Sequence, residues 1–379
     1  MKRTIIFVHG FFGWGEHDQS YRVFPQWGMG FGNTLKDLRR LGWDCHAPSL
    51  GPISSAWDRA CELYAQITGT RVDYGAAHSA KHGHARFGRT YDDAYAPNWS
   101  AENPIHLVAH SFGGATARLL LHLLSEGSAE EREACSDPSP LFLGGKADWV
   151  KSVTCIASPH NGTTYELAVN DPVRTLAKMN LPIAKMVMMM DEHKRYDFKL
   201  DHFGIAMSEG ESFPDAVARI VALLKAHDDG GVYDLSVDGA LALNKGITMP
   251  ENVYYFAEPC CISTPRADGT HRPNLLIPPT FRKNTKCMGV YGGCTTPGGF
   301  ELTMDWCRSD GLVNTLSAHH PFDTPYQELP ADAKAFRKGI WNVMPVTTAD
   351  HLQIQGFFWN PMKLKRFYRN IASRLEMLE

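Results

Sequence analysis

The sequence has no apolar run approaching the roughly 18 residues that a transmembrane helix needs. It has no basic excess, because 38 Lys and Arg stand against 41 Asp and Glu. It also has no block of like charges, no internal repeat and no low-complexity linker. We therefore expect a globular protein with no nucleic-acid partner and no integral membrane segment.

The nine cysteines include no CxxC pair, which excludes a cysteine zinc ribbon. Their odd number leaves at least one thiol unpaired within the chain. Five of them fall in the loop-rich stretch 260–307, where we expect one disulfide without assigning its partners. No leader of signal-peptide length precedes the first strand, so either the protein is cytosolic or a signal peptide has been removed.

A length of 379 residues with 44% hydrophobic content supports one large core. The first half alternates short buried strands with amphipathic helices, which predicts a mostly parallel sheet covered by helices on both faces, an α/β fold. We expect one domain over 1–379, enlarged by insertions, with extended loops at 258–308. Strands are predicted at 4–8, 43–47, 105–109, 150–156 and 253–257, and helices at 33–41, 54–67, 114–124 and 212–227.

The pattern changes to a Met-rich amphipathic helix after Tyr165. An ordinary packed helix would give the same spacing. Because methionine suits changeable apolar contacts, and because the segment soon follows a sheet strand, we interpret residues 165–205 as a lid.

The strongest local motif is AHSFG at 109–113, between an apolar strand and a small-residue helix. It matches the G-x-S-x-G nucleophile elbow of the α/β-hydrolase fold, with Ala109 in place of the first glycine. A chance serine in a turn is the alternative, but the strand and helix around it favour Ser111 as a nucleophile. Phe112 then offers a backbone N–H to an oxyanion, and HGF at 9–11 offers a second from Phe11.

The chain order of this fold places an acid and then a histidine after the serine. Asp310, in a loop that we expect to follow a late strand, and His351, ahead of the last helix, fit these roles. His351 would accept the proton of Ser111, and Asp310 would orient the imidazole. Asp350 is a competing acid, and His319 and His320 are competing bases; they fit less well.

Three histidines, His78, His82 and His84, crowd a Gly- and Ala-rich loop, and Asp58 lies in a helix before it. Two imidazoles with two carboxylates would make a closed tetrahedral zinc site. A polar surface loop explains the residues equally well from spacing alone.

Long segments of the chain resemble the large zinc-containing bacterial lipases of the Geobacillus and Staphylococcus type. These segments keep their order over nearly the whole sequence, and the one at 51–91 is peculiar to that family. They are HGFFGWG (9–15), residues 51–91, AHSFGG (109–114), SPHNGTT (158–164), YDFKLDHFG (196–204), YDLSVDGA (233–240), DGLVNT (310–315) and ADHLQIQG (349–356).

The resemblance implies a role for each matching position. Ser111, Asp310 and His351 would form the triad, and Phe11 and Phe112 the oxyanion hole. A structural zinc, held in an insertion at about 52–92, would take four ligands, while His82 would not bind it. The four are Asp58, His78, His84 and Asp234.

Two positions depart from the family pattern. The relatives bind calcium through a Glu two residues after the catalytic histidine and a later Asp, but here Gln353 and a carboxylate-free run follow. Since calcium prefers charged oxygen ligands, we predict that this site is lost or weak. The second departure is Phe112, where the relatives usually carry Gln.

The resemblance implies a secreted carboxylic ester hydrolase acting on hydrophobic esters such as triacylglycerols, at a lipid or polymer interface. Soluble esters or polyesters are open as substrates of the same mechanism. Two other hypotheses are an acyltransferase with an alcohol acceptor and a non-catalytic, zinc-stabilised binding protein. The complete triad argues against the binding protein.

Overall fold

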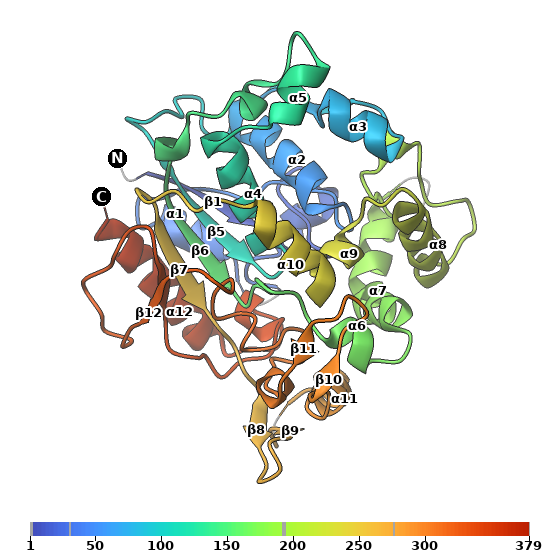
Figure 1. Cartoon of the computed structure of the whole chain (residues 1–379), viewed down its shortest axis with the longest axis vertical. Helices are drawn as coiled ribbons and strands as arrows, with labels where there is room; N and C mark the ends of the chain where they lie inside the picture. Colours follow the sequence, from blue (N-terminus) through green and yellow to red (C-terminus); the bar gives the residue numbers. More distant parts are fainter. Residues whose placement is uncertain (1–2, 30–31, 192–194, 276, 379) are drawn as a thin grey trace.

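A computed structural model describes residues 3–29, 32–191, 195–275 and 277–378. Seven parallel strands form the central sheet in the order β12-β13-β7-β6-β5-β1-β2 (Figure 1). The predicted α/β class is confirmed. The strands are β1 (Thr4–Val8), β2 (Asp44–His46), β5 (Ile105–His110), β6 (Val150–Ile156), β7 (Tyr254–Glu258), β12 (Tyr326–Glu328) and β13 (Trp341–Val343).

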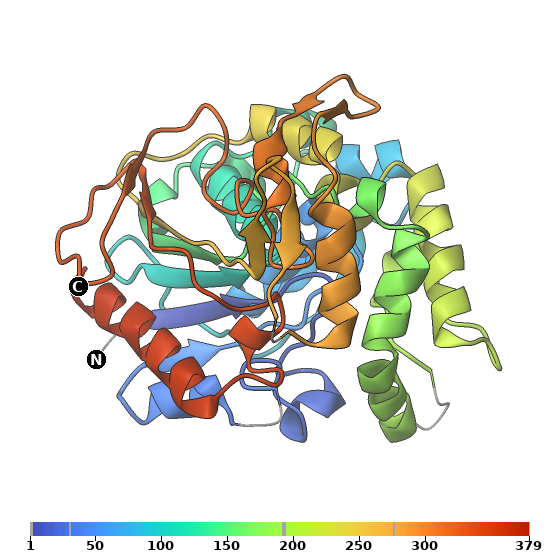
Figure 2. The same cartoon turned by 90° about the horizontal axis from the view of Figure 1, so that it is seen from below.

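Alternate residues of β1 face opposite sides of the sheet, as a strand requires. Ile6 and Val8 join the core cluster beneath α2 and α4, whereas Ile5 and Phe7 pack with α1 and α12 on the other face. Figure 2 shows the two helical layers with the sheet between them. These helices are α1 (Thr34–Arg39), α2 (Ala56–Thr68), α4 (Gly113–Ser125) and α12 (Pro361–Glu376).

In the segment between β2 and β5, α2 is followed by two antiparallel strands with a short helix between them. Ser55 caps α2 by accepting a hydrogen bond from the Asp58 amide at 3.2 Å. Gly69, at φ +68°, then ends the helix in the left-handed region that glycine favours. The following elements are β3 (Arg71–Asp73), α3 (Ala76–His82), β4 (Phe87–Thr90) and, after α4, α5 (Ala129–Ala134).

The predicted lid, 165–205, forms α6 (Tyr165–Ala168) and the 19-residue α7 (Pro172–Met190), and its positions 192–194 lie outside the described residues. α7 packs beside α8 (Phe213–Ala226), and the two helices stand together at one side of the sheet (Figures 1 and 2). Two shorter helices, α9 (Gly231–Leu235) and α10 (Val237–Gly246), lead back to β7.

Three expectations were wrong. The stretch 258–308 is not only extended loop, because it contains α11 (Pro279–Met288) and two small hairpins, β8 (Ser263–Pro265) with β9 (His271–Pro273) and β10 (Cys294–Thr295) with β11 (Glu301–Leu302). Asp310 follows a short 3-10 helix (Met304–Cys307) instead of a strand. All nine cysteines are free thiols, so the expected disulfide is not formed.

In the described part of the chain, no helix is both long enough and apolar enough to cross a bilayer.

Candidate active site and metal cluster

Ser111 lies on a tight turn between β5 and α4. Its φ of +56° is in the left-handed region, a strained conformation for a residue with a side chain. The turn needs small neighbours, since a Cβ at Gly113 would lie 2.3 Å from the Val8 carbonyl oxygen and one at Gly10 would lie 2.6 Å from Ser111 Cβ. The sequence motif therefore forms the expected elbow.

The structure brings Ser111, His351 and Asp310 into one hydrogen-bonded chain. His351 Nε2 is 2.8 Å from Ser111 Oγ, and His351 Nδ1 is 2.7 Å from Asp310 Oδ2. All three side chains are buried. A carboxylate only accepts, so Nδ1 carries the proton, and Nε2 is left to accept from the serine hydroxyl.

Backbone amides hold the Asp310 carboxylate in place. Its Oδ1 accepts hydrogen bonds from Leu312 N at 3.0 Å and Val313 N at 2.8 Å. The His351 amide donates to the Asp310 carbonyl at 3.2 Å, so backbone as well as side chain joins the acid to the base. Both oxygens of the acid are therefore satisfied.

The competing residues have other partners. Asp350 Oδ1 accepts hydrogen bonds from the amides of Leu352 and Gln353, and His319 Nε2 lies 3.2 Å from Glu328 Oε1. Burial raises the pKa of Asp350 to about 6, although those amide bonds oppose the rise.

The expected oxyanion donors are the backbone amides of Phe11, after β1, and Phe112, directly after Ser111. Phe12 N donates to Pro52 O at 2.8 Å, whereas the amides of Phe11 and Phe112 have no acceptor among the described residues. The rings of Phe11 and Phe112 contact edge to face, with centroids 6.2 Å apart. Neither amide is therefore engaged by another acceptor among the described residues, which a donor to an oxyanion requires.

An apolar cavity of about 80 Å³ lies over the triad, and α7 contributes Leu176 and Met179 to its wall. A second cavity of about 50 Å³ adjoins it and shares Phe11, Leu176 and Leu235. The lining of this second cavity is apolar except for Thr163 and Glu166. The space beside the serine therefore suits a hydrocarbon chain.

His110 is a residue that sequence reasoning did not assign. Its Nε2 lies 3.0 Å from the His351 carbonyl, and the two rings are 4.6 Å apart. Burial holds the pKa of His110 well below its usual range, so the ring is neutral and donates to that carbonyl. The sequence signal that could have indicated this role is the position of His110 directly before Ser111 in AHSFG.

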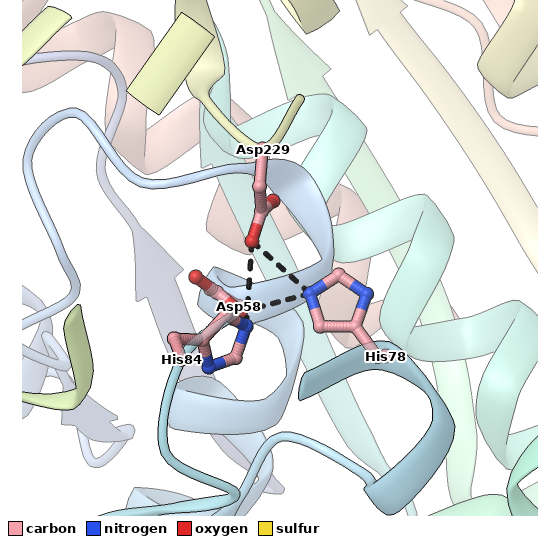
Figure 3. Close-up of side chains that lie close together, drawn as sticks. All are labelled: Asp58, His78, His84 and Asp229. Carbon is pink, nitrogen blue, oxygen red and sulfur yellow. Dashed lines mark hydrogen bonds and ion pairs between the residues drawn. The ribbon is translucent and has the colours of Figure 1, made fainter. Parts of the chain in front are cut away.

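A second cluster of buried polar side chains lies beneath the α3 segment. Asp58, His78, His84 and Asp229 each point a ligand atom at a common centre, and these atoms all lie within 4.8 Å of one another (Figure 3). His78 Nε2 is 3.3 Å from Asp58 Oδ1 and 3.2 Å from Asp229 Oδ2.

The donor atoms fit a metal ion. Asp58 Oδ1 and His84 Nε2 are buried without a hydrogen-bond partner in the described structure, which is costly unless a ligand satisfies them. His84 Nδ1 bonds the Ala85 carbonyl at 2.9 Å, so its Nε2 is the unprotonated, ligating nitrogen. Burial lowers the pKa of His78, but its bonds to Asp229 and Asp58 raise it overall to about 9.

The fourth member is Asp229 and not the expected Asp234. Asp229 lies in the loop before α9 and faces the two imidazoles. Asp234 lies within α9, where its carboxylate instead accepts the Ala56 amide at 2.7 Å, at the start of α2. The resemblance had pointed to Asp234, which lies five residues after Asp229 in the sequence.

Two histidines surround the cluster without belonging to it. His202 Nε2 is 2.9 Å from Asp58 Oδ2 and orients that carboxylate. His82, which the resemblance predicts is not a ligand, bonds the His227 carbonyl through Nδ1 at 2.9 Å and is outside the group of four.

Comparison with known proteins decides the family. The model of the lipase-like C-terminal domain matches residues 1–377. The chain belongs to this family. Lipase 2 of Staphylococcus aureus is 33% identical over 390 residues, covering 100% of the chain and 54% of the relative. The chain thus spans about half the length of the curated relatives it matches.

Solved structures agree with this assignment. The EstA structure from Clostridium botulinum has a TM-score of 0.87 at 34% identity, covering 100% of this chain and 88% of EstA. Lipase 1 from Pelosinus fermentans gives 0.82 at 35% identity, covering 98% of each chain. The Staphylococcus hyicus lipase gives 0.80 at 30% identity, with 100% and 96% covered.

Proposed function

We propose that the protein is a serine carboxylic ester hydrolase that acts on hydrophobic esters. The observation that carries the proposal is the chain of hydrogen bonds from Ser111 through His351 to Asp310 at the base of an apolar cavity. The relatives named lipase support the same chemistry.

The reaction proceeds through an acyl-enzyme. Ser111 Oγ bonds to the ester carbonyl carbon as its proton passes to His351 Nε2, and the carbonyl electron pair moves to the oxygen. The amides of Phe11 and Phe112 stabilise that oxyanion. The intermediate collapses, and His351 protonates the departing alcohol. Water, deprotonated by His351, then releases the acid and restores Ser111.

We propose that α7 and the segment around it, 165–205, act as a lid. Leu176 and Met179 of α7 cover the cavity above Ser111, while Met189 is 80% exposed near the far end of the helix. A covering helix with an exposed apolar end suits contact with a lipid or polymer surface. We also propose secretion, on the family resemblance alone.

We propose zinc as the ion of the Asp58, His78, His84 and Asp229 cluster. Two carboxylates and two imidazoles are a tetrahedral zinc donor set, and four protein ligands leave no open position for catalysis. When bound, the ion would cross-link α2, α3 and the loop before α9.

Hydrolysis of p-nitrophenyl esters from acetate to palmitate by the purified chain tests the function. We expect turnover that Ser111→Ala abolishes and that Ser152→Ala, a buried serine in β6 bonded to His106, retains. Hydrolysis that persists in Ser111→Ala would overturn the mechanism. No turnover of any ester would support a binding protein, and transfer to an added alcohol would identify an acyltransferase.

A further inference from the structure

Arg59 of α2 is fully buried, with 0% of its surface exposed. Its guanidinium has no carboxylate partner at salt-bridge distance in the described structure, and its three bonds go to neutral oxygens. Nη1 donates to Gly51 O at 2.6 Å, Nε donates to Thr116 Oγ1 at 3.0 Å, and Nη2 donates to His9 O. Glu62 interacts with Arg59 only at longer range, and a buried cation without a hydrogen-bonded carboxylate costs free energy, so its retention calls for a specific role.

The acceptors of Arg59 lie on both sides of the serine. His9 directly precedes Gly10 and Phe11, the source of one of the two proposed oxyanion amides. On the other side, the guanidinium carbon lies 5.2 Å from the centre of the Phe112 ring. The third acceptor, Thr116 Oγ1, itself bonds the Phe112 carbonyl at 3.4 Å. One planar group thus contacts the two segments that supply the oxyanion amides.

Two other contacts also join these segments: the Phe11 and Phe112 rings meet edge to face, and β1 pairs with β5 up to Val8 and Ala109. His9 Nε2 accepts from Leu50 N at 3.0 Å, and Phe12 N donates to Pro52 O, so these bonds hold only the β1 side. The elbow side depends on α4 and its contact with α2. The rigid, forked guanidinium is suited to join the two, because its donors lie in one plane with fixed spacing.

We propose that Arg59 is a positioning residue of the oxyanion hole, which keeps the amides of Phe11 and Phe112 directed at one oxygen. The proposal rests on the ester hydrolysis proposed above. Arg59 does not touch the substrate. It acts when Ser111 Oγ bonds to the carbonyl carbon and the carbonyl electron pair moves to the oxygen. A misplaced amide would weaken binding of that oxyanion more than binding of the neutral ester.

The test compares Arg59→Met and Arg59→Lys with Arg118→Met. Arg118 is a matched control because it too is a buried arginine whose pKa burial lowers to about 10, but it lies in α4 and bonds Asn244 Oδ1 at 2.8 Å. Competent sites are counted by the burst of p-nitrophenol from a p-nitrophenyl phosphonate, and kcat and KM for p-nitrophenyl butyrate are expressed per competent site. The affinity for a trifluoromethyl ketone, which forms a tetrahedral oxyanion on Ser111, is measured in parallel.

We expect Arg59→Met to lower kcat per site about 10- to 100-fold with KM changed less than about two-fold, and to lower ketone affinity by a similar factor. Arg59→Lys should recover part of the loss, and it carries the test if Arg59→Met does not fold. Arg118→Met should reduce the number of sites and leave kcat per site unchanged.

A kcat per site within about two-fold of wild type in both Arg59 variants would overturn the inference. An equal loss in Arg118→Met would do the same. In either case, wild-type turnover that depends on Ser111 would leave the proposed hydrolase function intact.

Discussion

The triad and the metal cluster use the same residue types in opposite ways. In the triad, one histidine joins one hydroxyl to one carboxylate in a line, and the serine borders a cavity. In the cluster, two carboxylates and two imidazoles converge on a point, and Asp58 Oδ1 and His84 Nε2 make no hydrogen bond within the described residues. A line of hydrogen bonds moves a proton, whereas a converging set binds a cation.

The two sites meet in α2. Asp58 belongs to the cluster, and the next residue, Arg59, bonds the segment that leads to the oxyanion loop. A second connection runs through Asp229, which lies two residues before Gly231. Gly231 packs tightly against both aromatic rings, since a Cβ there would lie 2.9 Å from the Phe112 ring and 3.0 Å from the Phe11 ring. We nevertheless expect a change in the triad to affect mainly chemistry and a change in the cluster to affect mainly stability.

The largest expected effect is on chemistry. Asp310→Asn should lower kcat about 10⁴-fold, because an amide favours the wrong histidine tautomer beside Ser111. Metal content and melting temperature should stay near wild type, since the cluster is untouched. Steady-state kinetics with metal analysis checks this, and a loss of bound metal in the variant would break the separation of the two sites.

The next effect is on stability. His84→Ala should lower the free energy of unfolding by about 3–5 kcal/mol, since it leaves the Asp229 carboxylate short of a buried partner and removes a proposed metal ligand. Chelation of the wild-type protein should lower its melting temperature in the same way. His82→Ala, outside the cluster, is the matched control and should keep its metal. Calorimetry of His84→Ala, of chelated wild type and of His82→Ala checks this expectation. Equal melting temperatures of the wild type with and without chelator would contradict it.

The ligand assignment itself can be sharpened. Asp229→Asn should bind less than one metal equivalent, whereas Asp234→Asn should retain it and lose about 1 kcal/mol of stability as its bond to the first turn of α2 weakens. Metal content by mass spectrometry distinguishes them. The reverse pattern would restore Asp234 as the ligand.

The smallest effect depends on pH. The pKa of Asp350 rises from about 3.9 in the unfolded chain to about 6 in the fold. A raised carboxyl pKa means that stability falls as pH rises between these values, by up to about 3 kcal/mol. Asp350→Asn removes this loss, so its stability relative to wild type should be higher at pH 8 than at pH 4. Urea unfolding at both pH values checks the sign, and a pH-independent difference would contradict it.

The sequence was sufficient where the signal is local or periodic. The strand Val150–Ile156 was predicted at its observed bounds because five of its seven residues are apolar or β-branched. Ser111 was predicted because its turn admits only small neighbours. These features need no knowledge of distant residues.

Contacts between residues that are far apart in the sequence were harder to predict. Asp229 joins the cluster from a loop whose direction depends on the end of α8, and no spacing rule separates it from Asp234. α11 was missed because Pro279 and the polar residues of the helix resemble a loop, although its Phe281 side chain is buried. The contacts of Arg59 depend on two segments about 50 residues away on either side.

Covalent labelling of Ser111 tests the central claim most directly. The purified chain would be treated with a p-nitrophenyl alkylphosphonate and digested, and the adduct would be located by mass spectrometry. The account predicts one adduct per chain, on the peptide containing Ser111, with loss of ester hydrolysis in proportion to labelling. Complete labelling of Ser111 with hydrolysis retained, or inactivation by an adduct on another residue, would contradict it.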